Sequence, residues 1–203
     1  MFVAITIFMS SAVAAELVGD PKAGKEKAAI CVACHGADGN SVNPQWPKIA
    51  GQGQRYFIAQ LKAFKQGGEG SRSGANAALM YPMAAQLSEQ DMVDLAAYFG
   101  EQKITLGVAD DSLARKGEAI YRGGNIDFGS AACIGCHGPS GKGNPTAGFP
   151  ALSGQHAAYV YNQLQAFHDD ERSGDPNGMM RNMVRKMSNE EMRAVAEYVQ
   201  GLY

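Results

Sequence analysis

The sequence predicts an all-α protein made of two tandem helical domains, residues 16–106 and residues 107–203. The first observation is a set of apolar side chains at helical spacing, namely Phe57, Leu61 and Phe64 at positions i, i+4 and i+7. The second is a series of residues that recurs in the same order about 100 positions later. A chain of 203 residues has room for one large domain or two small ones, and the repeat favours two.

Residues 1–15 form a short apolar segment that ends in small residues, Ala12-Val13-Ala14-Ala15. This pattern is typical of the latter part of a secretory signal peptide. The segment is shorter than a transmembrane helix, which needs about 20 apolar residues, and it lacks the usual basic residues at its start. We expect a cleaved signal peptide, with an uncleaved anchor as the alternative.

The first helix of the mature chain begins at Asp20-Pro21. Asp20 is a suitable N-cap and Pro21 suits the first helical position. The helix is expected to end near Cys31, which would leave Cys34 and His35 just beyond it. A loop rich in Gly, Asn and Pro follows over residues 36–47.

Two further helices complete the first domain. One is expected over residues 54–66, where Gly67-Gly68 stops it, and a loop then leads to Met80. The last helix begins at Ser88, whose Ser-x-x-Asp pattern with Asp91 is a variant of the capping box, and ends at Gly100. Its predicted inner face comprises Met92, Leu95, Ala96 and Phe99.

The second domain repeats these features in the same order. Cys31 matches Cys133 at an offset of 102 and Tyr56 matches Tyr159 at an offset of 103. Later matches share an offset of 100: Arg72 with Arg172, Met80 with Met180, Met83 with Met183, Ser88 with Ser188 and Tyr98 with Tyr198. The boundary is expected in the polar stretch 101–111.

Each domain contains one Cys-x-x-Cys-His motif, Cys31-Val32-Ala33-Cys34-His35 and Cys133-Ile134-Gly135-Cys136-His137. Together the motifs use all four cysteines and two of the four histidines in the chain. This spacing is the attachment signature for c-type haem, because two thiols one helical turn apart can each form a thioether and the histidine then reaches the iron. The sequence therefore predicts two covalently bound haem c groups.

The alternative uses of a Cys-x-x-Cys pair are zinc binding and dithiol redox chemistry. Both are less favoured, because each pair is followed directly by His and matched by a downstream Met. Attachment of haem c also fits export, since it takes place outside the cytoplasm in bacteria. We expect a periplasmic protein.

A second axial ligand must come from elsewhere in each domain. The two remaining histidines, His156 and His168, both lie in the second half, so the first domain has no histidine to spare. Methionine is the replacement that suits a c-type iron. We favour Met80 and Met180, which follow a Gly- and Asn-containing loop, and keep Met83 and Met183 as alternatives.

The charge distribution argues against a nucleic-acid partner. Residues 1–108 carry nine basic and nine acidic side chains, and residues 109–203 carry nine basic and eleven acidic ones. Non-specific binding to nucleic acid needs a basic surface, which this balance does not provide.

The chain resembles the class I dihaem cytochromes c of the cytochrome c4 type over essentially its whole mature length. The resemblance rests on the two Cys-x-x-Cys-His motifs, on Trp46-Pro47-x-x-x-Gly51-Gln52 with its match Phe149-Pro150-x-x-x-Gly154-Gln155, and on the Met-x6-Leu/Met-Ser segments from Met80 and Met180. It implies two class I cytochrome c domains related by approximate two-fold symmetry, with the haem edges near one another. It also places the axial methionines at Met80 and Met180.

The resemblance further implies electron delivery in the periplasm between partners such as a quinol-oxidising complex and a terminal oxidase, by a soluble or peripherally membrane-associated protein. In this fold the first and last helices cross closely, and the candidate pairs are Gly24 with Tyr98 and Gly117 with Tyr198. Five polar residues are candidates for contacts to the haem propionates, with exposure to solvent as the alternative: Gln52, Arg55, Arg72, Gln155 and Arg172.

We therefore expect a carrier of single electrons and not an enzyme, because two axial ligands on each iron leave no open position for a substrate. A cytochrome subunit of a larger oxidoreductase is the first alternative. A dihaem peroxidase is the less favoured one, since it would need a displaceable ligand at one haem.

Overall fold

The computed structural model describes residues 17–67, 70–125 and 129–203. The predicted signal peptide, residues 1–15, lies outside the described residues. Within them the secondary structure is helical, with isolated bridges and no named strand. None of the helices in these ranges has the length and apolarity needed to cross a membrane.

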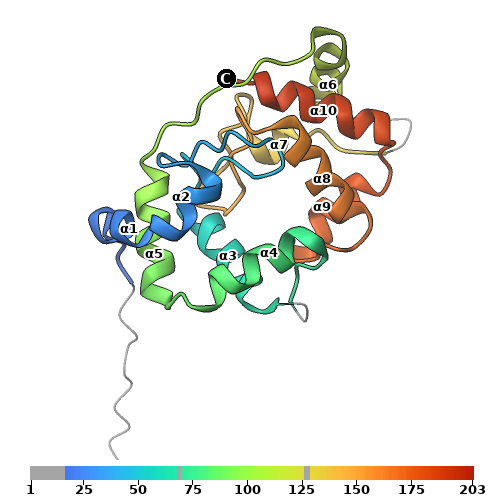
Figure 1. Cartoon of the computed structure of the whole chain (residues 1–203). Helices are drawn as coiled ribbons and strands as arrows, with labels where there is room; N and C mark the ends of the chain where they lie inside the picture. The colour runs from blue at the N-terminus through green and yellow to red at the C-terminus, as the bar shows by residue number, and fades with distance from the viewer. Residues whose placement is uncertain (1–16, 68–69, 126–128) are drawn as a thin grey trace, which may run out of the picture.

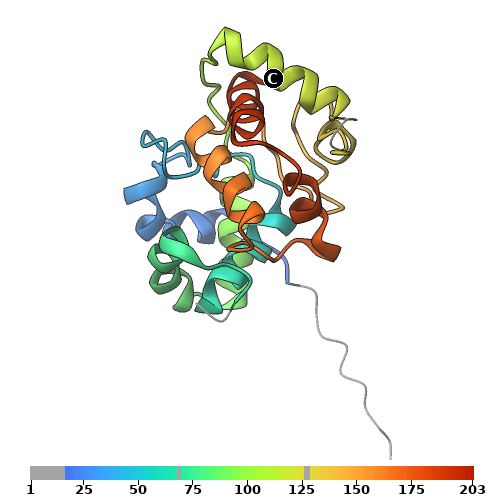
Figure 2. The same cartoon turned by 90° about the vertical axis from the view of Figure 1, so that its right-hand side faces the viewer.

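The helices fall into two sets that lie side by side, coloured blue to green and yellow to red in Figure 1. The first set is α1 (Pro21–Lys27), α2 (Ala29–His35), α3 (Gln54–Lys65), α4 (Gly74–Ala85) and α5 (Glu89–Gly100). The second set is α6 (Asp111–Gly123), α7 (Ile134–His137), α8 (Ala157–His168), the 3-10 helix η2 (Pro176–Gly178), α9 (Met179–Val184) and α10 (Asn189–Gly201). Figure 2 shows the same helices from the side, and the prediction of two tandem all-α domains is confirmed.

Each half has its own apolar core, and the two cores use matched positions. In the first half Met92, Leu95 and Phe99 on α5 pack with Leu61 on α3. In the second half the equivalent members are Met192, Val195, Val199 and Leu164. The predicted inner face of the last helix is thus buried in both halves, as helical periodicity requires.

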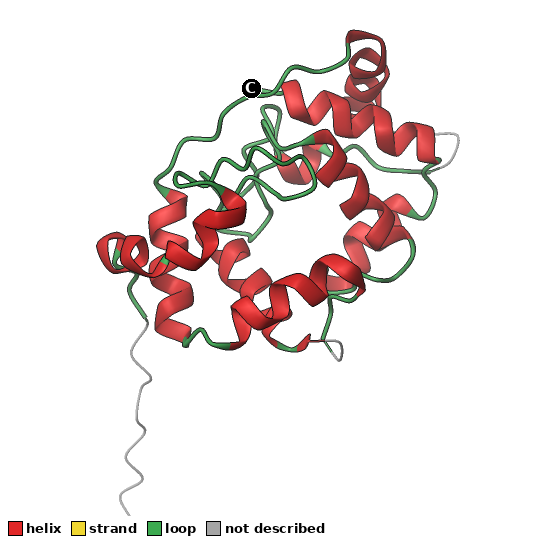
Figure 3. Cartoon of the chain, in the orientation of Figure 1, coloured by secondary structure: helices red, strands yellow, loops and turns green. Residues whose placement is uncertain are grey.

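Several helices begin at the N-cap residues that the sequence predicts. The Asp20 carboxylate accepts from the Lys22 N–H at 2.8 Å at the start of α1. Ser88 and Asp91 form a reciprocal capping box at the start of α5, and Ser188 with Glu191 does the same for α10. Figure 3 shows these helices joined by loops rather than strands.

The first and last helices of each half cross at a glycine. An ideal Cβ on Gly24 would lie 2.1 Å from the Asp94 carbonyl oxygen and 2.9 Å from the Tyr98 Cβ. One on Gly117 would lie 2.0 Å from the Ala194 carbonyl oxygen and 2.8 Å from the Tyr198 Cβ. The predicted glycine–tyrosine pairs are confirmed, and the closest partner is in fact the backbone of the opposite helix.

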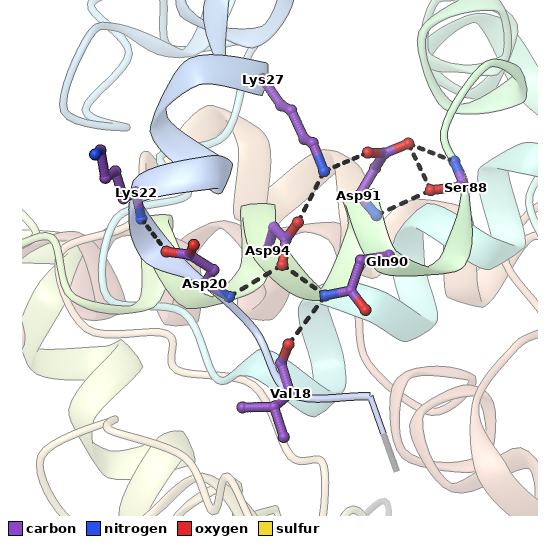
Figure 4. A network of polar contacts seen from close by, with 8 residues as sticks. All are labelled: Val18, Asp20, Lys22, Lys27, Ser88, Gln90, Asp91 and Asp94. Atoms are coloured by element: carbon purple, nitrogen blue, oxygen red, sulfur yellow. Dashed lines mark hydrogen bonds and ion pairs between the residues drawn. The ribbon is translucent and has the colours of Figure 1, made fainter. Parts of the chain in front are cut away.

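A polar network also ties α1 and its N-cap to α5 (Figure 4). The Asp94 carboxylate accepts from the Asp20 N–H at 3.0 Å and from the Lys27 ammonium at 2.8 Å. Lys27 also pairs with Asp91 at 2.6 Å. These contacts hold α1 against the last helix of its domain, so the motif that follows α1 starts from a fixed position.

One local prediction was wrong, and two helices were not predicted. Cys34 and His35 lie inside α2, because after Lys27 the chain resumes a helical path at Ala29 and continues through the motif. Met80 lies on α4, despite Pro82 in the same helix, and Met180 lies on α9, two helices that follow the expected loops. Tertiary packing evidently outweighs the local signals of Gly, Asn and Pro there.

The two halves meet along a line of backbone pairing between equivalent segments. Arg72 and Arg172 form an isolated antiparallel bridge. The Ser73 N–H donates to the Glu171 carbonyl and the Ser173 N–H donates to the Ser71 carbonyl, each at 2.8 Å. Pairing of a segment with its own repeat gives the approximate two-fold relation between the domains.

Candidate functional site

In the first motif the two thiols sit one helical turn apart on α2. Cys31 is half-buried and packs against the first apolar core, while Cys34 is exposed. Burial raises the pKa of the Cys31 thiol to about 11, so it is protonated at neutral pH. His35 follows in the last turn of the helix and is buried.

The second motif has the same arrangement. Cys133 is half-buried against the second core and Cys136 is exposed. Burial raises the pKa of the Cys133 thiol to about 11, and His137 is buried at the end of α7. None of the four cysteines forms a disulfide, so all four are available for thioether bonds.

Each motif histidine is oriented by a proline carbonyl. His35 Nδ1 lies 2.8 Å from the Pro47 carbonyl oxygen, and His137 Nδ1 lies 3.0 Å from that of Pro150. Because a carbonyl only accepts, Nδ1 carries the proton and donates, which leaves the lone pair on Nε2. Burial lowers the pKa of both imidazoles, so both are neutral near pH 7 and suited to metal binding.

The candidate methionines differ in where they pack. Met80 lies against the same apolar core as Cys31, and Met180 lies against the same core as Cys133. Met83 and Met183 are half-buried, but among the described residues they do not pack against either core.

The other two histidines are occupied elsewhere. His156 Nε2 lies 2.9 Å from the backbone oxygen and the hydroxyl of Ser41 in the opposite domain. The Ser41 hydroxyl donates to the Trp46 carbonyl at 2.7 Å, so the imidazole donates to the Ser41 carbonyl. His168 is exposed and pairs with the neighbouring Asp169. Neither histidine makes these contacts with a residue of a Cys-x-x-Cys-His motif.

The residues present fit a covalently held haem in each half. Each site offers one exposed and one half-buried thiol on a single helical turn, and a neutral histidine with its Nε2 lone pair free. A thioether-containing side chain lies in the same apolar surroundings. Two thiols that can form thioether bonds, an imidazole and a methionine sulfur are the groups that c-type haem uses.

Arg72 and Arg172, two of the polar candidates from the sequence, are buried at the boundary between the domains. Arg72 is 7% exposed and Arg172 is 8% exposed, and both guanidinium groups donate to Gln163 Oε1. Arg172 also donates to the Tyr56 hydroxyl at 2.7 Å and to Gln60 Oε1 at 3.0 Å. Neither arginine forms an ion pair with a carboxylate in the described part of the chain.

Each arginine also lies over the face of an aromatic ring, which stabilises the positive charge in part. Arg72 lies 4.4 Å from the Phe64 ring centre and Arg172 lies 4.3 Å from that of Phe167. In the sequence, these two arginines stand out because they match each other across the repeat. Their neighbouring residues do not distinguish them from exposed arginines. Of the remaining candidates, Arg55 donates to the Thr146 carbonyl at the surface.

Comparison with known proteins agrees with this arrangement. The cytochrome c family model matches residues 21–103 and again residues 114–203. The chain belongs to the cytochrome c family. A cytochrome c4 of Azotobacter vinelandii is 48% identical over 193 residues, which cover 93% of this chain and 92% of that relative.

A solved structure and a second relative extend the comparison. The crystal structure of reduced recombinant cytochrome c4 from Pseudomonas stutzeri matches with a TM-score of 0.87 and 46% identity, covering 92% of this chain and 100% of that one. A protein named thiosulfate dehydrogenase electron acceptor, from Thiomonas intermedia, is 37% identical over 182 residues, covering 87% of this chain and 80% of the relative. The resemblance to the cytochrome c4 type is confirmed.

The chain is therefore a dihaem electron carrier and not an enzyme. Its two Cys-x-x-Cys-His sites fit two covalent haem c groups, each of which, when bound, takes up and releases one electron at its iron. The chain's own residues anchor these groups and hold each motif histidine buried, neutral and in a fixed orientation.

Proposed function

We propose that the protein carries single electrons in the periplasm between a quinol-oxidising donor and an acceptor such as a terminal oxidase. In this proposal His35 with Met80 and His137 with Met180 are the axial ligands, and Cys31, Cys34, Cys133 and Cys136 form the thioethers. Residues 16–106 and 107–203 are the two folding units, and residues 1–15 are the signal that directs export. Peripheral contact with the membrane is compatible with this role.

The observation that carries the proposal is the hydrogen bond from each motif histidine to a proline carbonyl. It fixes the tautomer, so that Nε2 is the only nitrogen available to a metal, and it raises the basicity of the ligand. The shared packing of Met80 with Cys31, and of Met180 with Cys133, supports these methionines over Met83 and Met183.

Substitution of single methionines tests the ligand assignment. Met80→Leu is expected to remove the charge-transfer band between sulfur and ferric iron at one of the two sites, which halves its intensity. Met83→Leu is the matched control, three residues away on the same helix, and should leave the band unchanged. Loss of the band in Met83→Leu with retention in Met80→Leu would overturn the assignment.

A second candidate function is that of a cytochrome docked to a dehydrogenase rather than a free carrier. The observation in its favour is the 37% identity to the protein named thiosulfate dehydrogenase electron acceptor. Stable co-purification with a dehydrogenase would support this second function over the first.

A further inference from the structure

Two glutamines cross the domain boundary and bind the opposite half in the same way. Gln155 Oε1 accepts from the Lys48 N–H at 2.9 Å, and its Nε2 donates to the Lys48 carbonyl at 2.7 Å. Gln52 Oε1 accepts from the Ala151 N–H at 2.9 Å, and its Nε2 donates to the Ala151 carbonyl at 3.1 Å. Each side-chain amide thus pairs with both backbone groups of one residue in the other domain.

The residue that each glutamine binds directly follows the proline that orients a motif histidine. The Lys48 N–H and the Pro47 carbonyl belong to one peptide group, and so do the Ala151 N–H and the Pro150 carbonyl. A peptide group is planar, so fixing the direction of its N–H also fixes the direction of its carbonyl. Gln155 therefore fixes the carbonyl that accepts from His35, and Gln52 fixes the one that accepts from His137.

These contacts form a continuous chain of hydrogen bonds from one domain to the ligand of the other. In the first domain the chain runs from His35 Nδ1 through the Pro47–Lys48 peptide to Gln155 Oε1. Hydrogen bonds linked through one peptide group polarise and strengthen one another. The bond from the histidine to its carbonyl therefore depends on a glutamine of the opposite domain.

The glutamines are held firmly enough to act in this way. Gln155 is only 6% exposed, and its Oε1 also accepts from the His156 N–H at 3.1 Å. Gln52 Oε1 accepts likewise from the Gly53 N–H at 2.9 Å. Because each amide oxygen has two backbone donors, the side chain has little freedom to turn.

We propose that Gln52 and Gln155 are cross-domain positioning residues, each of which orients and polarises the histidine ligand of the opposite domain. This inference rests on the proposed role of His35 and His137 as iron ligands. If a glutamine only held the two domains together, its substitution would weaken the interface and affect both haems alike. If it positions the opposite histidine, its substitution should change the reduction potential of the haem in the opposite domain more than that of the haem in its own domain.

The direction of the effect follows from ligand basicity. A histidine that donates a strong Nδ1 hydrogen bond is a stronger base toward its metal, and it stabilises the more positive, oxidised iron. Removing the glutamine weakens that bond, so the reduction potential of the opposite site should rise. Gln155→Leu should raise the potential of the haem held by Cys31 and Cys34.

The test is a potentiometric titration of the holoprotein followed by the hyperfine-shifted proton resonances, which report each haem separately. Gln155→Leu should shift the first-domain haem upward and leave the second nearly unchanged, and Gln52→Leu should do the reverse. Ser73→Ala is the matched control, because it removes another cross-domain hydrogen bond, 3.1 Å to the Glu171 carbonyl, that does not touch a proline peptide. It should move neither potential.

Glutamate variants provide the same test if a leucine variant fails to fold. Gln155→Glu and Gln52→Glu keep the length of the side chain and supply a stronger acceptor to the backbone N–H, although they lose the amide donor to the backbone carbonyl. Each should lower the potential of the opposite haem more than that of the haem in its own domain. Equal shifts at both haems, a larger shift in the variant's own domain, or no shift in any variant would overturn the proposal. If the wild-type protein lacked histidine-ligated iron in its proton spectrum, the proposed ligands would fail instead, so the two outcomes are distinguishable.

Discussion

The helix crossing at Gly117 gives the sharpest test of what holds the second domain together. In Gly117→Ala the new Cβ would start 2.0 Å from the Ala194 carbonyl oxygen. An ordinary carbon–oxygen contact is about 3.3 Å, so α6 and α10 would have to separate by about 1.3 Å. The clashing oxygen belongs to the backbone and cannot rotate away as a flexible side chain could. The clash can therefore be relieved only by moving the helices apart, which costs stability.

Two opposing energies decide the net effect. Replacing glycine by alanine inside a helix gains roughly 1 kcal/mol of helix propensity. Overpacking costs about 1–3 kcal/mol and sometimes more, and a backbone clash of this size belongs at or above the upper end. We therefore expect a net loss of about 2 kcal/mol, which corresponds to a urea midpoint lower by about 1 M for a domain of this size.

The assay is urea unfolding of the holoprotein followed by far-ultraviolet circular dichroism. Gly123→Ala is the matched control, because it makes the same substitution in the same helix at a position where, among the described residues beyond its own turn of helix, no heavy atom lies within 4 Å of the new Cβ. The control should unfold at the wild-type midpoint or slightly above it. If Gly117→Ala proved as stable as Gly123→Ala, the argument from close helix crossing would be wrong.

Two more predictions concern single polar contacts. The ion pair with Lys27 and the hydrogen bond to Ser88 lower the pKa of Asp91 from 3.8 to about 2. Its carboxylate therefore stabilises the fold above about pH 4, and this contribution is lost as the pH falls toward 2. The stability advantage of the wild type over Asp91→Asn should shrink across that range in urea midpoints measured at each pH. Tyr121 is fully buried and donates to the Gly138 carbonyl at 2.7 Å, so Tyr121→Phe should cost about 1–3 kcal/mol in the same assay at neutral pH. An unchanged midpoint would show that Gly138 finds another donor.

The sequence was most informative where a local pattern determines a local structure. Asp20 and Ser88 cap their helices as predicted, because an N-cap depends on residues within one turn. The glycine crossings at Gly24 and Gly117 were expected from the resemblance to class I cytochromes c, in which the first and last helices cross closely. The two attachment motifs follow from cysteine spacing alone.

Local pattern failed where tertiary packing decides the backbone. Pro82 and the Gly/Asn-containing sequence before Met80 favour a loop, yet α4 runs over Gly74–Ala85. Similarly, Arg72 and Arg172 have the residue type that is normally exposed. They are buried because Phe64, Phe167 and several amide and hydroxyl oxygens surround them, most from distant parts of the chain.

The contacts of Gln52 and Gln155 lay beyond sequence analysis for a different reason. The repeat shows that the two residues are equivalent, but it does not say whether each one binds its own domain or the other. Only the arrangement of the halves shows that the partners are exchanged, Gln52 with Ala151 and Gln155 with Lys48. An internal repeat therefore predicts which segments form each domain, but the contacts between the domains can be identified only from the structure.

The interface is symmetric in its backbone hydrogen bonds but not in its charge. Lys48 and Ala151 are equivalent residues, and only Lys48 carries an ammonium group, which is buried and donates to the Gly154 carbonyl at 3.1 Å. Burial lowers the pKa of Lys48, as expected for a cation that lacks a carboxylate partner among its contacts. The ammonium group itself lies against the second domain, at the Gly154 carbonyl, in the segment that follows Pro150. Because Ala151 supplies no equivalent charge toward the first domain, the boundary combines matched backbone contacts with an unequal distribution of charge, and the two motifs stand in different electrostatic surroundings.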